Sequence, residues 1–276
     1  MATEKQSKFR QVYVAPGESV LSSNILQIIC VFSRRAIVAC CYNAKGVVTA
    51  VQYMAYHTDK PIWDTDFFEY TLATDPVFAN KEKISKVFIL TDRELLIPEE
   101  LYNEADSHQW LRHTYFIEPN DSILSQKAAD AQAHLVYAVP SNIKELIHIN
   151  FLQASILPLS YYLVNTPQQA NYVVRCCLTG EQAITTLFYQ GKILWHKAIE
   201  YIRAEDIAYY VRLVCQEHQI EANRLILNCN YLHTSEYVIV NELSQYFAAV
   251  RTGDGQKIEG AWLPIITLFQ QLIVCG

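Results

Sequence analysis

The loop Thr252-Gly-Asp-Gly-Gln256 is the stretch of this sequence best suited to bind an anion. Two glycines separated by one residue let backbone N–H groups approach a phosphate closely, and such nests work best directly before a helix. Thr252, Gly253, Asp254 and Gly255 are therefore candidate cofactor-binding residues. An ordinary turn explains the same residues, because no clear helix start follows them.

Asp92 and Glu94 are the acidic residues best placed to hold a divalent metal ion. They follow a short apolar run, Val87–Leu90, and ligand sites gather at the carboxyl ends of strands. A ribonuclease-H-type nuclease also needs a carboxylate on its first strand, and the expected first strand, Asn24–Phe32, contains none. A solvated turn explains Asp92 and Glu94 equally well, so no metal site is predicted.

No other spacing of reactive side chains matches a known catalytic pattern. The eight histidines form neither HExxH nor HxH, and His108 and His113 are five apart, so they do not share a helix face cleanly. The sequence contains no GxSxG element and no CxxC pair. We therefore predict no catalytic residue, no metal ligand and no cofactor.

The eight cysteines lie in apolar surroundings and are expected to be buried free thiols. Cys40–Cys41 and Cys176–Cys177 are adjacent pairs inside β-type runs, so the two members of each pair should point to opposite faces of a sheet. Free thiols indicate a reducing compartment, and Met1–Arg10 is polar rather than signal-like. The sequence therefore predicts a cytoplasmic protein.

Length and composition describe a packed globular protein. The 276 residues suffice for one large domain or two of about 130 residues. Hydrophobic residues make up 51% and charged residues 18%, and the net charge of −6 argues against a nucleic-acid partner. Ala261–Gly276 carries no charge but is too short to span a bilayer, so a buried terminal helix is expected, with membrane or partner contact as the alternative.

Apolar runs and turn residues predict an ordered series of elements in the N-terminal half. Strands are expected at Ile25–Phe32, Ala36–Tyr42, Val47–Tyr53, Val87–Leu90, Ser122–Lys127 and His134–Val139. Helices are expected at Asp64–Ala73, from Pro98 to about Leu111, and after Pro140-Ser141 with Ile143, Leu146 and Ile147 inward. Turns are expected at Arg34–Arg35 and at Asn43–Gly46, where Gly46 accepts a positive φ.

The second half, after a linker at Thr166–Gln169, follows the same order. Strands are expected at Tyr172–Leu178, Ala183–Tyr189, Ile193–Ile199, Leu225–Asn228 and Tyr246–Val250, and helices at Ala204–His218 and Ser235–Leu243. Each half therefore contains a hairpin, a third strand, a helix and a short strand. We predict an α/β protein with mixed sheets, built from two β-β-β-α-β units. The predicted lobes are residues 1–166, with an inserted subdomain at about 92–139, and residues 167–276.

Two such units in one chain resemble the actin-like superfamily, which is a duplicated ribonuclease-H-like fold. The stretch Tyr172–Asn228, with Leu187-Phe-Tyr-Gln-Gly-Lys-Ile193 before the helix Ala204–His218, is similar to actin-like proteins of type IV pilus and type II secretion assembly. The chain as a whole resembles a bacterial family, a domain of unknown function, with a degenerate actin-like fold.

An active ATPase of this superfamily implies an Asp and a Gly at the first hairpin, a similar pattern at the second, and paired glycines after the short strand. The first hairpin reads Cys30-Val-Phe-Ser-Arg-Arg-Ala36, the second Arg175-Cys-Cys-Leu-Thr-Gly-Glu181, and the expected adenosine loop Asn228-Cys-Asn-Tyr-Leu232. None contains an Asp, and the whole chain has only eight glycines, less than half the number that is usual at about 7%. The resemblance therefore implies a pseudo-ATPase.

These observations favour a non-enzymatic scaffold or adaptor that binds a protein partner. Tyr209 and Tyr210 are neighbours on a predicted helix, so one of them should be partly exposed and could contribute to a partner surface. Two alternatives stay open. The chain could be a divergent ATP-binding phosphotransferase that uses Thr252–Gln256, or a membrane-associated assembly component tethered through Ala261–Gly276.

Overall fold

The computed structural model describes residues 9–19, 27–56, 61–128, 131–165, 172–221, 224–253, 257 and 259–275. The chain divides into two compact units. The first comprises Met1–Thr91, His108–Leu124 and Tyr137–Leu159, and the second Asp92–Ser107, Ser125–Val136 and Ser160–Gly276. The predicted lobe boundaries stay predictions. The predicted linker Thr166–Gln169 and the loop residues 254–256 lie outside the described residues.

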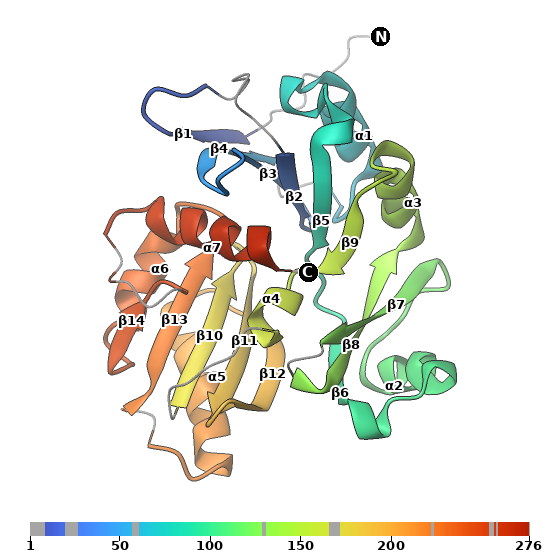
Figure 1. Ribbon diagram of the computed structural model, residues 1–276. Coiled ribbons are helices and arrows are strands. Elements are labelled where there is room, and N and C mark those ends of the chain that lie inside the picture. The colour runs from blue at the N-terminus through green and yellow to red at the C-terminus, as the bar shows by residue number, and fades with distance from the viewer. Residues whose placement is uncertain are drawn as a thin grey trace. The chain divides into compact units, whose positions relative to one another are not determined.

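The first unit is built on a six-stranded mixed sheet (Figure 1). Its strands are β1 (Phe9–Val14), β2 (Gln27–Phe32), β3 (Ala36–Tyr42), β4 (Val48–Ala55), β5 (Ile84–Ile89) and β9 (Ser155–Pro158). They lie in the order β1-β4-β3-β2-β5-β9. Strands β2, β3 and β4 form antiparallel hairpins, whereas β5 pairs in parallel with β2 and β9 in parallel with β5.

One face of this sheet forms a core with α1 (Thr65–Thr74), the 3-10 turn η1 (Pro76–Phe78) and α3 (Ser141–Asn150). The alternate strand residues Cys30, Phe32, Ile37, Cys41 and Met54 meet Phe67, Phe68, Val77, Phe78, Ile143 and Ile147 there. Residues of opposite parity on the same strands, such as Ile29 and Val38, are also fully buried. Both faces of the central strands are therefore closed to solvent.

The second unit repeats this sheet almost strand for strand. Its strands are β10 (Tyr172–Leu178), β11 (Gln182–Tyr189), β12 (Lys192–Glu200), β13 (Ile226–Tyr231) and β14 (Ala249–Arg251), in the order β12-β11-β10-β13-β14. This is the order β4-β3-β2-β5-β9 of the first unit, with the same pattern of parallel and antiparallel neighbours. The predicted duplication of a β-β-β-α-β unit in mixed sheets is confirmed.

The described residues of the second unit include the helices α4 (Tyr161–Val164), α5 (Ala204–Glu217), α6 (Glu236–Leu243) and α7 (Leu263–Val274). Helix α5 packs against β12 and α6, and α7 packs against β13 (Figure 1). Helix α5 begins where the Asp206 carboxylate accepts the backbone N–H groups of Ile202 and Arg203, at 2.9 Å each. Those bonds satisfy N–H groups that a helix start leaves without partners.

The prediction of a helix beginning at Pro98 was wrong. Pro98 is the last residue of β6 (Glu94–Pro98), and after two 3-10 turns (Glu99–Leu101 and Glu104–Asp106) the helix α2 spans Ser107–Thr114. A fixed φ near −65° suits the end of a strand as well as the start of a helix, and proline loses no ladder bond at such a position. The Glu99 N–H donates to the Gln132 carbonyl at 2.8 Å and fixes this exit.

Strand β6 joins β7 (Asp121–Ala128) and β8 (Ala133–Pro140) in a three-stranded sheet with the order β6-β8-β7. The unit boundary divides β7 and β8 along their length. Sequence patterns indicated β7 and β8 but missed β6, and they also missed β1, β9 and α4. Each of the missed elements has only four to six residues, which leaves too little periodicity to recognise.

The cysteines are free, and all except the partly exposed Cys275 are buried. Cys41 points into the core beside α1, while its neighbour Cys40 has the opposite parity on β3 and is buried as well. Burial raises the pKa of the Cys41 thiol to about 12 and of the Cys177 thiol to about 12. These thiols stay protonated and act as small hydrophobic side chains, as the sequence predicts.

The C-terminal apolar segment forms α7 and packs inward. Ile265, Leu268, Phe269 and Leu272 are buried, whereas Gln270 is exposed. Among the helices in the described part of the chain, none has both the length and the apolar run that crossing a membrane requires. The expectation of a buried helix is confirmed for these residues.

We predict that Leu268→Ala lowers the free energy of unfolding by about 2 to 5 kcal/mol, because it opens a cavity under α7. Urea denaturation followed by circular dichroism measures the change. Gln270→Ala, an exposed position on the same helix, is the control and should change stability little. Equal stability of the two variants would contradict a core role for α7.

Candidate functional site

The tip of the β2–β3 hairpin closes on its own backbone. Ser33 directs its backbone N–H and its hydroxyl to the carbonyl oxygen of Ala36, at 2.9 and 3.2 Å. The Tyr56 N–H donates to the Arg35 carbonyl at 3.2 Å, and the Tyr56 hydroxyl donates to the Arg34 carbonyl at 2.7 Å. The tip is therefore held by hydrogen bonds within the chain.

The β10–β11 hairpin of the second unit repeats this arrangement. Thr179 directs its N–H and its hydroxyl to the Gln182 carbonyl, each at 2.9 Å. The Tyr201 N–H, just after β12, lies 3.5 Å from the Glu181 carbonyl, as Tyr56 pairs with Arg35 in the first unit. The duplication therefore extends from strand order to the individual bonds of the turn.

In both units, the residue after the central parallel strand makes the same backbone hydrogen bond to the end of the neighbouring strand. The Leu90 N–H donates to the Phe32 carbonyl at 2.7 Å, and the Leu232 N–H donates to the Leu178 carbonyl at 3.1 Å. Ligand sites in open α/β sheets lie at the carboxyl ends of parallel strands, which in the second unit are the ends of β10 and β13. Gly180 and Leu232 mark this end of the second sheet.

A buried carboxyl group, Glu236, lies at this end of the sheet in the first turn of α6. A Cβ placed on Gly180, whose φ is +92°, would be 4.0 Å from the Glu236 Oε1 atom. The Tyr201 hydroxyl donates to the Glu236 carboxyl. Burial raises the pKa of Glu236, although hydrogen bonds from Tyr201 and Ser235 oppose the rise. A carboxyl group with a raised pKa is the type of side chain that general acid chemistry uses.

His233 is the second titratable group at this end of the sheet. Its Nδ1 atom lies 2.6 Å from the Ser235 hydroxyl, and burial lowers its pKa, which favours the neutral imidazole. Glu236 is only 5% exposed and Tyr201 only 9%, so neither presents a free face to a substrate.

Sequence reasoning missed Glu236. The available signal was an acidic residue in the first turn of a helix that follows a parallel strand.

No group of three or more His, Cys, Asp or Glu side chains with metal-ligand geometry occurs among the residues that the structure describes.

Of the candidate anion loop, the structure describes Thr252 and Gly253, while Asp254 and Gly255 fall outside the described residues. Thr252 is fully buried, and the Gly253 N–H donates to the Asn230 Oδ1 atom at 3.0 Å. A Cβ on Gly253 would lie 2.5 Å from Asn230 Nδ2 and 2.8 Å from the Gln271 side chain. A larger residue at this position would have to displace the ends of the Asn230 and Gln271 side chains, and binding of a phosphate by the loop stays a prediction.

The expected adenosine loop, Asn228–Leu232, is largely strand. Residues 228–231 are the end of β13, and Cys229, Asn230 and Tyr231 are buried. The Asn230 Nδ2 atom donates to the Gln271 Oε1 atom at 3.1 Å, which links β13 to α7. The short strand is longer than its apolar run suggested, because polar asparagines continue it.

Arg175 is a buried cation that the sequence analysis did not single out. Its Nη1 atom donates to the carbonyl oxygens of Tyr162 and Leu163, at 2.8 and 2.9 Å, and Nη2 lies 3.4 Å from Gln271 Oε1. The guanidinium also lies over the Tyr162 ring, 5.3 Å from its centroid. Within the described part of the chain no carboxylate pairs with it, and burial lowers its pKa.

The carbonyls that Arg175 binds belong to the short helix α4, whose last carbonyl groups have no partner inside the helix. Those oxygens carry partial negative charge and stand in for a counter-ion. The sequence signal was a single charge in the otherwise apolar strand Tyr172–Leu178. Arg175 therefore fastens α4 to β10, and its contacts give it a structural role.

Of the predicted acidic pair, Glu94 is buried and Asp92 is partly exposed. The expectation of a solvated turn is therefore wrong for Glu94. Its Oε1 atom lies 3.2 Å from His196 Nε2, and its Oε2 atom accepts the Ser160 hydroxyl at 2.5 Å. The Thr186 hydroxyl lies 2.8 Å from His196 Nδ1.

The order hydroxyl, imidazole, carboxylate matches the arrangement that activates a nucleophile. Thr186 and Ser160 are fully buried, however, so no substrate can reach either hydroxyl in this conformation. The chain of bonds joins β6 to β12 and to the start of α4, all within the second unit. Its role is to hold the inserted strand β6 in place.

We predict that Glu94→Ala destabilises the protein by about 3 to 5 kcal/mol, because it leaves His196 and Ser160 buried without their acceptor. Chemical denaturation measures the loss. Glu99→Ala removes an exposed carboxylate paired with Lys127 on the same segment and should have little effect. If both variants are as stable as the parent, the buried network does not anchor β6.

Solved structures are similar to this chain over nearly its full length. A Bacteroides thetaiotaomicron protein with an actin-like ATPase fold and unknown function has 14% identity and a TM-score of 0.71, over 89% of this chain and 96% of that one. The PilM–PilN type IV pilus biogenesis complex has 7% identity and a TM-score of 0.53, over 91% and 98%. These likenesses show the fold alone: the chain has an actin-like ATPase fold.

The cytoplasmic domain of EpsL, an inner membrane component of the type II secretion system of Vibrio cholerae, has 10% identity and a TM-score of 0.47, over 90% of this chain and 95% of that one. No curated protein is similar in sequence to this chain. Residues 22–250 match the family DUF3822, described as a protein of unknown function. The chain belongs to the DUF3822 family.

Proposed function

We propose that this protein is a non-enzymatic scaffold or adaptor of the cytoplasm, in which a degenerate actin-like fold binds a protein partner. Three features support the proposal. At the tips of the β2–β3 and β10–β11 hairpins, polar groups form hydrogen bonds within their own turns. The expected adenosine loop is largely strand, and helix α5 has exposed aromatic side chains on its outer face.

The observation that carries the proposal is the closure of both hairpins. A phosphate nest needs backbone N–H groups that point away from the protein toward the anion. Here the N–H groups of Ser33 and Thr179 donate to the Ala36 and Gln182 carbonyls of their own turns. The first tip also carries arginines, and neither tip carries the aspartate that a metal–nucleotide complex requires in this superfamily.

The partner surface is assigned to the outer face of α5. Tyr209, Tyr210 and Leu213 are exposed there, at 64%, 42% and 41%, while Ile207 and Val211 on the opposite side are buried. Both tyrosines are exposed, although only one was expected to be. The two rings pack edge to face with centroids 5.6 Å apart, which limits their freedom before binding. Rigid aromatic side chains are typical anchors of protein interfaces.

Contacts at the surface beside this face also hold α5. The Arg212 guanidinium lies 5.4 Å from the Tyr246 ring centroid, and the Tyr246 hydroxyl donates to Glu205 at 3.1 Å. A preformed surface loses little conformational entropy on association. The PilM–PilN structure, which shares the fold, is by its name a complex of two proteins, and this precedent supports a binding role.

We predict that Mg-ATP does not raise the thermal unfolding temperature of the protein at millimolar concentration. A ligand present at 100 times its dissociation constant stabilises the native state by about 2.7 kcal/mol, which a thermal shift readily detects. Clear stabilisation would instead favour the ATP-binding phosphotransferase. In that case Asp254→Ala, in the candidate anion loop, should abolish the shift.

We predict that replacing Tyr209 and Leu213 together by alanine removes the partner from affinity-purified protein while leaving the fold intact. Quantitative mass spectrometry of proteins bound from native lysate measures the loss. The matched control replaces Tyr70 and Leu152, an exposed tyrosine and leucine of the first unit. A partner retained by the first double variant, or lost equally by both, would contradict the assignment to α5.

A further inference from the structure

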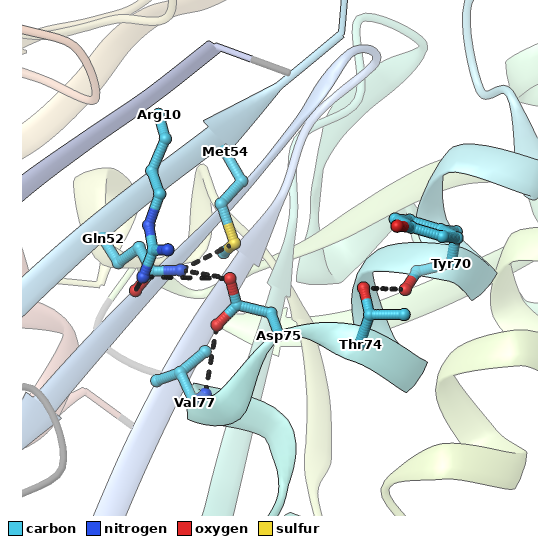
Figure 2. Close-up of polar contacts among 7 residues, drawn as sticks. All are labelled: Arg10, Gln52, Met54, Tyr70, Thr74, Asp75 and Val77. Atoms are coloured by element: carbon cyan, nitrogen blue, oxygen red, sulfur yellow. Dashed lines mark hydrogen bonds and ion pairs between the residues drawn. The ribbon is translucent and has the colours of Figure 1, made fainter. Parts of the chain in front are cut away.

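Strand β1 is an edge strand whose one charged side chain, Arg10, is 49% exposed and reaches Gln52 and Asp75 of the same unit. Arg10 donates from Nη2 to the Gln52 Oε1 atom at 2.7 Å, and Nη2 lies 3.9 Å from the Asp75 carboxylate (Figure 2). Gln52 in turn donates to Asp75 at 2.7 Å, and Asp75 accepts the Val77 N–H at 3.1 Å. An outward charge is one device that keeps edge strands from pairing with other chains. Here the half-exposed guanidinium lies over one face of the sheet, bound to Gln52 and near Asp75, and not along the open backbone edge.

The outer edge of β1 offers unpaired backbone groups. β1 is the last strand of its sheet in the part of the chain that the structure describes. Val14 lies opposite Ala50 on β4, and the next residue, Ala15, donates its N–H to the Thr49 carbonyl at 2.9 Å. Hydrogen-bonding residues alternate along an antiparallel ladder, so Arg10, Val12 and Val14 point their N–H and C=O groups away from β4.

Both faces of β1 also expose apolar side chains. Val12 and Val14 extend the core face of the sheet, and Phe9 lies on the opposite face against the Tyr53 ring, with centroids 6.3 Å apart. Phe9, Val12 and Val14 are 49%, 39% and 36% exposed. A six-residue strand with outward backbone groups, three exposed apolar side chains and its one charge held by Gln52 and Asp75 of the same unit is suited to strand addition.

We propose that two copies of this chain associate by antiparallel pairing of their β1 strands across a two-fold axis. In this register Val12 lies opposite Val12 of the second copy, and Arg10 lies opposite Val14. The outward backbone groups of Arg10, Val12 and Val14 then bond those of the second copy, and the two sheets become continuous.

Charge and side-chain pairing favour a second copy as the occupant. The two Arg10 residues lie at opposite ends of the paired strands, so no like charges face each other. The β-branched Val12 pair forms the centre, and Gln11 faces Tyr13 on the other side of the ribbon. Any other occupant must supply a complementary apolar strand, whereas a second copy carries one by symmetry.

Pairing of a single strand buries less area than the roughly 1,000 Å² typical of stable interfaces, so association should be reversible and concentration-dependent. This proposal goes beyond the scaffold function and does not depend on it. It also involves a different unit from the α5 face, so the two can fail separately.

Sedimentation equilibrium over about 1 to 500 micromolar protein tests the proposal. The average mass of the parent chain should rise toward that of a dimer. Val12→Lys and Val12→Glu each place like charges opposite one another and should stay monomeric. An equimolar mixture of the two variants should associate again, because lysine then faces glutamate. This rescue is specific to a register in which Val12 meets itself.

Val47→Lys is the matched control, since it adds the same charge at an exposed valine in the turn between β3 and β4, outside β1. It should associate as the parent does. Circular dichroism checks that each variant is folded. A parent chain that stays monomeric over the whole range, or folded variants that do not associate when mixed, would overturn the proposal.

Hydrogen exchange on the parent chain gives a second measurement that needs no substitution. Exchange of the Val12 and Val14 amides should slow as concentration rises, whereas the Gln11 amide, which already faces β4, should not respond. Exchange of Val12 that is independent of concentration would contradict pairing at β1.

Discussion

Burial of both faces of two central β-sheets is the constraint on which this structure depends. Strands such as β2, β3, β10 and β11 have almost no exposed residue, so polar groups on them and at their ends must find partners within the chain. Each unit meets this requirement in the same way. A Ser or Thr after the first strand bonds the carbonyl three residues on, and the N–H after the parallel strand bonds back to the first.

The same constraint explains why residues that look chemically active serve the fold. Glu94 accepts Ser160 and contacts His196, Glu236 accepts Tyr201, and Arg175 binds two helix carbonyls. In each case the group is buried, and a buried polar group without its partner costs more free energy than the bond itself contributes.

Outside the two buried sheets, two exposed surfaces are available for binding. Helix α5 closes the sheet with Ile207 and Val211 and leaves Tyr209 and Leu213 outside, while β1 lies at the limit of its sheet with Val12 half covered. These two surfaces differ in kind. The first is a rigid helical face suited to a shaped partner, and the second is a line of backbone donors and acceptors suited to another strand.

The sequence by itself determined the repeated order of strands and helices, because short, mainly apolar runs bounded by turn residues, such as Ala36–Tyr42 and Tyr172–Leu178, indicate buried strands. Both runs match observed strands residue for residue. It also determined the buried, unreactive state of the paired cysteines and the lack of aspartate in the hairpins. It could not place β6, β9 or α4, whose few residues carry no periodicity. Only the tertiary structure decided that Glu94 meets His196, 102 residues away, and that Gly253 meets Gln271. Such pairings depend on which strands become neighbours in a sheet, and that choice is made by packing over the whole unit rather than by any local pattern.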